Sequence, residues 1–402
     1  MSDFTKNIKE IRKDIAIGLA NQFLPFMLIA LFVSWFEGIP NIAALGAIFG
    51  VFALILFAYG YGLSASAIDK YATYKGYRNF CFIYSILNIF GLSILFLLRN
   101  KNLARNSDTN REPLDNFSIA AIFYSYLSVP LVVISLISIP ITIYTKENFI
   151  ELYENNQNFN ELINIIISIF IANYFFQELN RAKLRKRIIF GSLKELNWKL
   201  PIGLAIVQYF FNRGINPITL YILSFIAPTY VENQVNQEYA TTVLGWISFF
   251  FFALIYAPIM EELFFRGIIF QKVAIKKNMF KGLLISAVLF AVMHLRFDII
   301  PLCLFGIVTA ILYFKTKQLA SPIIYHFTYN LIVVSKRTYY HFFVNPTFPT
   351  QTTILELQQH IVDNLDTCAF FLAITVPYLT YFIYKNFPRD RDINKLPYFV
   401  NQ

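Results

Sequence analysis

Long apolar runs separated by short polar segments dominate this chain. A helix that crosses about 30 Å of hydrocarbon needs about 20 predominantly apolar residues. Runs near that length predict membrane-spanning helices at residues 15–36, 42–63, 80–98, 117–144, 162–178, 202–227, 242–260, 279–295, 299–315, 318–335 and 369–385. The pattern therefore predicts an all-α fold, a polytopic helical bundle integral to the membrane.

Composition supports this class and excludes others. Hydrophobic residues make up 57% of the 402 positions and charged residues 14%, whereas a soluble domain carries about 25% charged residues. The net charge of +10 is then read as Lys and Arg in cytoplasmic loops and against anionic lipid headgroups. No continuous basic face typical of nucleic-acid binding is present. We therefore expect the lipid bilayer, and no nucleic acid, as a partner.

The three cysteines offer neither a metal pair nor a disulfide framework. Cys81, Cys303 and Cys368 are far apart and each lies in apolar sequence. An even set at regular spacing would be needed for a disulfide scaffold, and closely spaced pairs for a metal site. We interpret them as buried thiols without a chemical role.

Charge in the loops determines the orientation of the second half of the chain. The segment 179–200 is rich in Lys and Arg, whereas 228–241 has none and contains two glutamates. The positive-inside rule places the first in the cytoplasm and the second outside. The helix predicted at 242–260 then runs toward the cytoplasm and ends at Glu261. The N-terminal orientation stays open, because the basic segments there do not alternate.

Three short fragments place ionisable or polar groups in apolar sequence. They are Glu261-Glu262-Leu263-Phe264-Phe265-Arg266, Phe290-Ala291-Val292-Met293-His294 and His326-Phe327-Thr328-Tyr329-Asn330. An ionisable side chain costs about 2.5–3.5 kcal/mol in a membrane helix on insertion scales, so such residues mark functional sites. Taken together, the fragments indicate a buried reaction centre.

Helical spacing assigns different surroundings to the two glutamates. A helix turns about 100° per residue, so Glu262 and Arg266 share a face and are expected to form an ion pair. Glu261 points elsewhere and stays free to face a cavity. The pair Ser321-Pro322 predicts an N-cap followed by proline at the first helical position. This puts His326 one turn into a helix.

Each fragment alone also has a plainer interpretation. The glutamates and Arg266 can form a salt-bridge cluster that reaches the headgroups. His294 lies beside Arg296 and Asp298 and can be a loop-end histidine at the interface. The joint occurrence of the fragments, in this order and in apolar sequence, favours a site.

The residues resemble the CPBP intramembrane proteases, the CAAX protease and bacteriocin-processing family that includes the type 2 CAAX prenyl proteases. Smaller features agree, namely Pro258, Gly267 and the pair Phe305-Gly306. The resemblance covers roughly 200–336. It implies a family-like catalytic core of about six helices at 201–336, after an N-terminal membrane region of unknown role at 1–200. Residues 337–402 are expected to be a polar connection, a C-terminal membrane helix and a tail.

The resemblance also implies roles for the site residues. Glu261 is the general base that takes a proton from water, and His294 holds that water. His326 and Asn330 stabilise the oxyanion, while Glu262 and Arg266 support the site. The expected activity is an intramembrane endopeptidase that acts on a membrane-associated protein or peptide. Basic residues at 267–281 suggest that the site opens toward the cytoplasm.

A metal is a second possibility for the same residues. Glu261, His294 and His326 match the two imidazoles and one carboxylate of a catalytic zinc site, and the family has often been labelled metalloprotease. However, the chain has no His-Glu-x-x-His motif, and ligation would remove Glu261 as the base. We therefore favour a metal-free mechanism without a cofactor.

Two functions outside this class stay open. A catalytically silent scaffold or regulator of the same fold has no physical need for the full set of motifs. A transporter with an intramembrane proton relay would show repeated halves with interrupted helices, which the sequence lacks. The pattern leaves the substrate open among a prenylated protein tail, a peptide leader and a neighbouring membrane protein.

Overall fold

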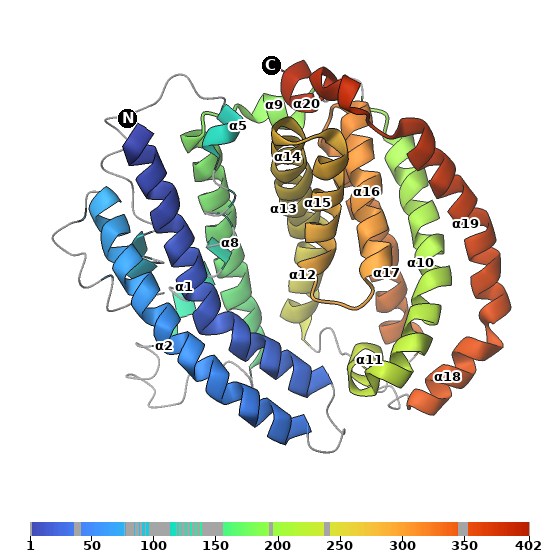
Figure 1. Cartoon of the computed structure of the whole chain (residues 1–402). Coiled ribbons are helices and arrows are strands. Elements are labelled where there is room, and N and C mark those ends of the chain that lie inside the picture. The colour runs from blue at the N-terminus through green and yellow to red at the C-terminus, as the bar shows by residue number, and fades with distance from the viewer. Residues whose placement is uncertain are drawn as a thin grey trace. The chain divides into compact units, whose positions relative to one another are not determined.

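The fold was obtained as a computed structural model, and the residues that it describes are mainly helical (Figure 1). It describes residues 2–35, 42–75, 156–192, 196–236, 242–344 and 353–401, together with single positions and short segments between 77 and 138. The chain divides into two compact units. Unit 1 contains 1–111 and 120–176, and unit 2 contains 112–119 and 177–402. The predicted three-part division stays a prediction.

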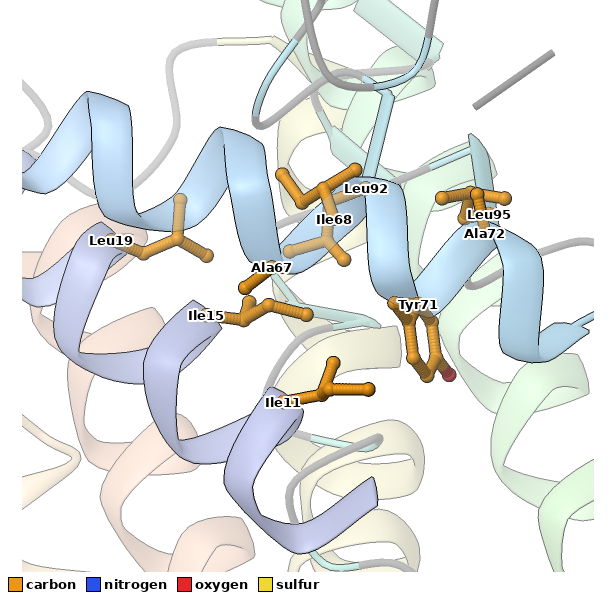
Figure 2. Packing of buried hydrophobic residues seen from close by; sticks show 9 residues of the cluster. All are labelled: Ile11, Ile15, Leu19, Ala67, Ile68, Tyr71, Ala72, Leu92 and Leu95. Atoms are coloured by element: carbon orange, nitrogen blue, oxygen red, sulfur yellow. The ribbon is translucent and has the colours of Figure 1, made fainter. Parts of the chain in front are cut away.

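Unit 1 is built on two long helices, α1 (Ser2–Trp35) and α2 (Ile42–Lys75). A Cβ added to Gly60 would clash with the carbonyl oxygen of Gly18, so the two backbones approach closely at this glycine pair. Apolar side chains fill the space between the helices, as Figure 2 shows. The cluster consists of Ile11, Ile15, Leu19, Ala67, Ile68, Tyr71, Ala72, Leu92 and Leu95. Unit 1 therefore has an apolar core of its own.

One further long helix, α8 (Gln157–Arg181), continues from unit 1 into unit 2. The remaining helices of unit 2 are α5 (Pro113–Asn116), α9 (Lys186–Phe190), α10 (Lys199–Ile226), α11 (Pro228–Val235), α12 (Val243–Phe251), α13 (Ala257–Glu262), α14 (Gln271–Lys276), α15 (Met279–Val292), α16 (Ile299–Thr316), α17 (Ala320–Tyr339), α18 (Ile354–Asp363), α19 (Leu365–Asn386) and α20 (Pro397–Val400). Shorter π- or 3-10-helical segments are η3 (Phe252–Tyr256), η4 (Leu263–Phe270), η5 (Tyr340–Val344) and η6 (Asp390–Lys395). No strand is present in the described residues.

The all-α, polytopic membrane class is confirmed. Five helical stretches of the described chain are long and apolar enough to cross a bilayer, at Phe52–Lys75, Gln157–Asn180, Val243–Lys276, Ile299–Thr316 and Leu365–Asn386. The predicted runs at 80–98 and 117–144 fall largely outside the described residues.

One boundary prediction is wrong, and the error changes the setting of the site. The helix predicted to end at Glu261 continues without a break from Val243 to Lys276. Glu262 and Arg266 neutralise each other within it, and the residues of η4 are all buried. Because the charges are paired inside the protein, the helix does not have to end where they occur. The glutamates thus lie within this helix and not at its end.

The start of α17 is a second correction. The helix begins at Ala320, so Ser321 lies in its first turn and is not the N-cap. The Ser321 hydroxyl has no hydrogen-bond partner among the described residues. The backbone N–H of Ser321 instead bonds to Gln318 O at 3.2 Å and that of Ile323 to Leu319 O at 3.2 Å. Backbone carbonyls before the helix thus extend it toward its N-terminus.

Close packing in unit 2 brings the three sequence fragments together. Helix α15 lies along α16, and α17 packs against α10, α16, α13 and η3 (Figure 1). A Cβ added to Gly306 would lie 2.7 Å from Ala287 Cα, so the backbones of α15 and α16 nearly touch there. This approach places Phe305 of α16 beside Phe290 of α15, with ring centroids 5.4 Å apart.

Candidate active site

The helix that carries the glutamates alternates between α- and π-helical segments. Glu261 and Glu262 end the short segment α13, which lies between the wider segments η3 and η4. In η3 the N–H of Ala257 bonds to Phe252 O, five residues back. The next residue, Pro258, has no N–H and disfavours a regular α-helix before it. Such π segments occur frequently at functional sites.

Glu262 is completely buried and holds two partners. Its Oε2 lies 3.2 Å from Arg266 Nε, as the i to i+4 spacing predicts. The geometry is that of a charge pair without an aligned hydrogen bond. Its Oε1 lies 3.0 Å from His326 Nδ1. The second contact joins residues 64 positions apart, so the spacing within a single helix could not predict it.

Arg266 is stabilised by aromatic faces as well as by Glu262. Its side chain is fully buried, and its guanidinium carbon lies 4.4 Å from the ring centroid of Phe290 and 5.8 Å from that of Phe265. A cation over an aromatic ring is attracted by the negative face of the ring. No acceptor among the described residues receives an aligned hydrogen bond from the guanidinium, so Glu262 and the two rings are what stabilise its charge.

The contact with Glu262 determines where His326 carries its proton. A carboxylate that neutralises Arg266 can only accept hydrogen bonds, so His326 Nδ1 is the donor. In the neutral ring Nε2 then has a free lone pair, and in the protonated ring Nε2 is a second donor. The His326 ring is buried and stands edge-on to Phe305 with centroids 4.9 Å apart. Packing and the carboxylate together fix its orientation.

His294 faces Glu261 from the turn after α15. The sequence predicted a helix up to residue 295, but α15 ends at Val292 and Leu295 has a φ of 50°. His294 Nδ1 lies 2.7 Å from Phe290 O, and a carbonyl can only accept, so Nδ1 carries the hydrogen. The lone pair of neutral Nε2 then faces Glu261 Oε2 at 4.0 Å. Both side chains are partly exposed, at 29% and 28%.

Phe290 links the fragments at their centre. Its ring is buried and lies 4.7 Å from the ring of His294 and 6.1 Å from that of His326. It also lies under the Arg266 guanidinium. The six polar residues singled out by sequence thus belong to one neighbourhood in unit 2, with Asn330 joined to it through the backbone of η3.

Asn330 makes a contact that the sequence did not reveal. Its Nδ2 donates to Ala253 O at 2.7 Å. The amide has a second N–H, which is the group available for the predicted oxyanion role. That role stays a prediction.

Sequence reasoning also missed a polar network beside the site. Tyr325 OH donates to Gln208 Oε1 at 3.1 Å, and Gln208 Nε2 donates to Asn212 Oδ1 at 2.8 Å. Asn212 Nδ2 in turn donates to Tyr329 OH. These bonds join α10 to the helix of His326. The partners are 117 residues apart, and only buried amides in apolar sequence hint at them.

A separate contact holds the turn that carries His294. Phe297 N donates to Tyr230 OH at 3.2 Å, and the two rings stand edge to face with centroids 4.7 Å apart. Tyr230 belongs to α11. The short helix α11 is thus part of the support for His294.

The residues that the sequence offered as alternative zinc ligands do not form a complete ligand set in the described part of the chain. In the parts of the chain that the structure describes, no group of three or more His, Cys, Asp or Glu side chains is arranged to hold a metal ion. The 4.0 Å between His294 Nε2 and Glu261 Oε2 also exceeds about 3.3 Å, the separation of two tetrahedral ligands at zinc bond lengths near 2.0–2.1 Å. The metal-free mechanism stays a prediction.

Comparisons with known proteins agree with the resemblance inferred from the motifs. Residues 243–332 match the family described as "Type II CAAX prenyl endopeptidase Rce1-like". This match spans α12 to α17 and contains all six site residues. The resemblance to CAAX proteases is thereby confirmed for this segment.

Two relatives extend the comparison. The chain is 28% identical over 183 residues to the membrane-embedded CAAX protease MroQ of Staphylococcus aureus. The aligned region covers 42% of this chain and 66% of that protein. It is 41% identical over 83 residues to a protein of Bacillus subtilis named "Putative membrane peptidase YdiL", 20% of this chain and 33% of the relative. The chain thus covers less than two thirds of each relative. No solved structure matches it significantly.

Proposed function

We propose that this protein is an intramembrane endopeptidase that hydrolyses a peptide bond with a water activated by Glu261. The observation that carries the proposal is the pair formed by Glu261 Oε2 and His294 Nε2 at 4.0 Å. A carboxylate oxygen and an imidazole lone pair are both acceptors, so they do not bond directly to each other. Two acceptors at this separation favour a donor between them.

We propose that a water molecule bridges the two atoms, since Glu261 Oε2 is buried and has no hydrogen-bond partner among the described residues. With hydrogen bonds of about 2.8 Å to each acceptor, a 4.0 Å separation requires an angle of about 90° at the water oxygen, near the angle between its two O–H bonds. Such a water donates one hydrogen to Glu261 and one to His294. Its lone pairs then point away from both and toward a substrate carbonyl. Glu261 takes the proton as general base when the oxygen attacks, and it gives that proton to the amine nitrogen when the C–N bond breaks.

His326 is the proposed donor to the oxyanion. Because Nδ1 donates to Glu262 Oε1, Nε2 donates only when the ring is protonated. Asn330 offers its second N–H beside it. Preorganised donors aimed at the developing charge each contribute about 10²–10³ in turnover. Glu262 and Arg266 act through His326 in this scheme, as its counter-ion and as the balancing charge.

The proposed substrate is a membrane-associated protein or peptide. One relative is named a CAAX protease, which supports this class without fixing whether the substrate carries a prenyl group. The site is proposed to open toward the cytoplasm, because Lys272, Lys276, Lys277 and Lys281 follow η4 and the positive-inside rule keeps such residues in the cytoplasm.

The test compares membranes that contain the wild-type protein with membranes that contain Glu261→Ala. We expect new peptide termini in a membrane-associated protein only with the wild type, at equal abundance of the two proteins. Glu232→Ala is the matched control, because Glu232 is exposed on α11 and lies outside the proposed chemistry. Termini that persist in full with Glu261→Ala would overturn the assignment.

A further inference from the structure

The carbonyl of Ala253 in η3 has no helical partner. In this segment Ala257 N–H bonds to Phe252 O, so the residue four positions on does not donate to Ala253. The residue five positions on is Pro258, which has no N–H. Within the hydrocarbon of a bilayer, no water is available to donate a hydrogen bond to a backbone carbonyl. The proline therefore creates an acceptor that another group has to satisfy.

Asn330 is that group. Its Nδ2 donates to Ala253 O at 2.7 Å, and the contact requires the amide nitrogen because a carbonyl only accepts. Asn330 lies on α17, which packs against η3 and α13. One turn earlier on the same helix, His326 binds Glu262 at 3.0 Å. Helix α17 thus holds the glutamate helix at two points, one before and one after Pro258.

We propose that Asn330 is a positioning residue for the glutamate pair. It binds the carbonyl that Pro258 leaves without a helical partner, and so fixes the widened turn that precedes Glu261 and Glu262. The amide has two N–H groups. One binds Ala253 and the other is the donor that the proposed function assigns to the oxyanion, so the first bond also orients the second donor. The catalytic part of this inference rests on the proposed function, whereas the structural part does not.

The structural part is tested by a double-mutant cycle in the purified protein. In the π register of η3, the N–H gained in Pro258→Ala points at Ala253 O. Asn330→Ala alone is expected to lower the apparent melting temperature by about 2–4 °C, because the carbonyl loses its partner. In the Pro258→Ala background, Asn330→Ala is expected to lower the melting temperature by less than half as much. Equal losses in both backgrounds would overturn the proposal.

A matched control separates this bond from general packing. Asn212 is also an amide that reaches α17, through Tyr329, but among the described residues it has no hydrogen bond to Ala253 O, which accepts from Asn330. Its change to alanine should lower the melting temperature by the same amount with and without Pro258→Ala. The new N–H does not fill the cavity that a shortened side chain leaves, so coupling to Pro258 that is present for Asn330→Ala and absent for Asn212→Ala is assigned to the hydrogen bond.

Activity provides a readout that a purely structural role would not change. Per folded molecule, Asn330→Ala should lower kcat for the substrate found by the membrane comparison and leave KM within about twofold. Adding Pro258→Ala should raise kcat at least threefold over Asn330→Ala, and the remaining deficit measures the lost oxyanion donor. No gain in kcat would overturn the positioning role. A wild type that cleaves nothing would refute the proposed function, while the melting cycle still tests the bond.

Discussion

The buried pair of Glu262 and Arg266 yields the sharpest prediction about stability. Both side chains have 0% exposure and their charged atoms approach to 3.2 Å. Arg266→Ala leaves the Glu262 carboxylate with His326 as its remaining partner. Removing one member of a buried pair costs about 3–5 kcal/mol, because the other charge is left uncompensated. This is a large share of the 5–15 kcal/mol that separates folded from unfolded domains.

The compensating change is Glu262→Gln in the same protein. The glutamine has no charge that requires Arg266, and its amide oxygen can still accept from His326 Nδ1. Replacing both charges of a buried pair is often nearly neutral. The double variant Glu262→Gln/Arg266→Ala should therefore recover part of the folded protein that Arg266→Ala loses.

The assay is the amount of monodisperse protein after extraction in detergent, together with its melting temperature. Arg266→Ala should reduce both strongly, and Arg266→Lys should reduce them less, since it keeps the charge but not the planar group above Phe290. A double variant that is less abundant than Arg266→Ala alone would refute the reasoning. The pair would then owe its stability to packing and not to charge.

Three further predictions concern the site. If His294 holds the water and His326 stabilises the oxyanion, the purified protein should still cleave its substrate after exhaustive chelation and should carry substoichiometric zinc. One zinc per chain, lost together with activity in His294→Ala and in His326→Ala, would contradict the metal-free mechanism. Tyr230→Phe removes the acceptor of Phe297 N–H and should lower turnover about threefold to tenfold at unchanged abundance, because one hydrogen bond holding the His294 turn is lost; full activity would show that the ring contact suffices. A cysteine placed at Lys276 should react with a membrane-impermeant thiol reagent only from the cytoplasmic side, and labelling from outside would reverse the proposed orientation.

The sequence predicted much of the site because its signals are local. The ion pair of Glu262 and Arg266 follows from helical spacing alone, and it is present. Apolar runs predicted the helices of unit 2, including α10, α16 and α19. These features depend on residues within a few positions of each other, so the geometry of one isolated helix is sufficient to predict them.

The parts that were missed depend on contacts between distant segments. The helix continues through Glu261 because Arg266 neutralises Glu262 inside the protein and His326 donates a hydrogen bond to it; His326 lies on α17, 64 positions away. The bond from Asn330 to Ala253 requires both the π segment and the fold that brings α17 to it. Neither is encoded in the spacing of one helix.

The central claim is that Glu261 and Glu262, adjacent in sequence, perform different tasks. Its most direct test is the initial rate of substrate cleavage by purified Glu261→Gln and Glu262→Gln, measured side by side at equal amounts of folded protein. We predict no detectable cleavage by Glu261→Gln, because an amide cannot act as the general base. Glu262→Gln should retain measurable cleavage, since its amide oxygen still accepts from His326. The opposite order, with Glu261→Gln active and Glu262→Gln silent, would contradict the account.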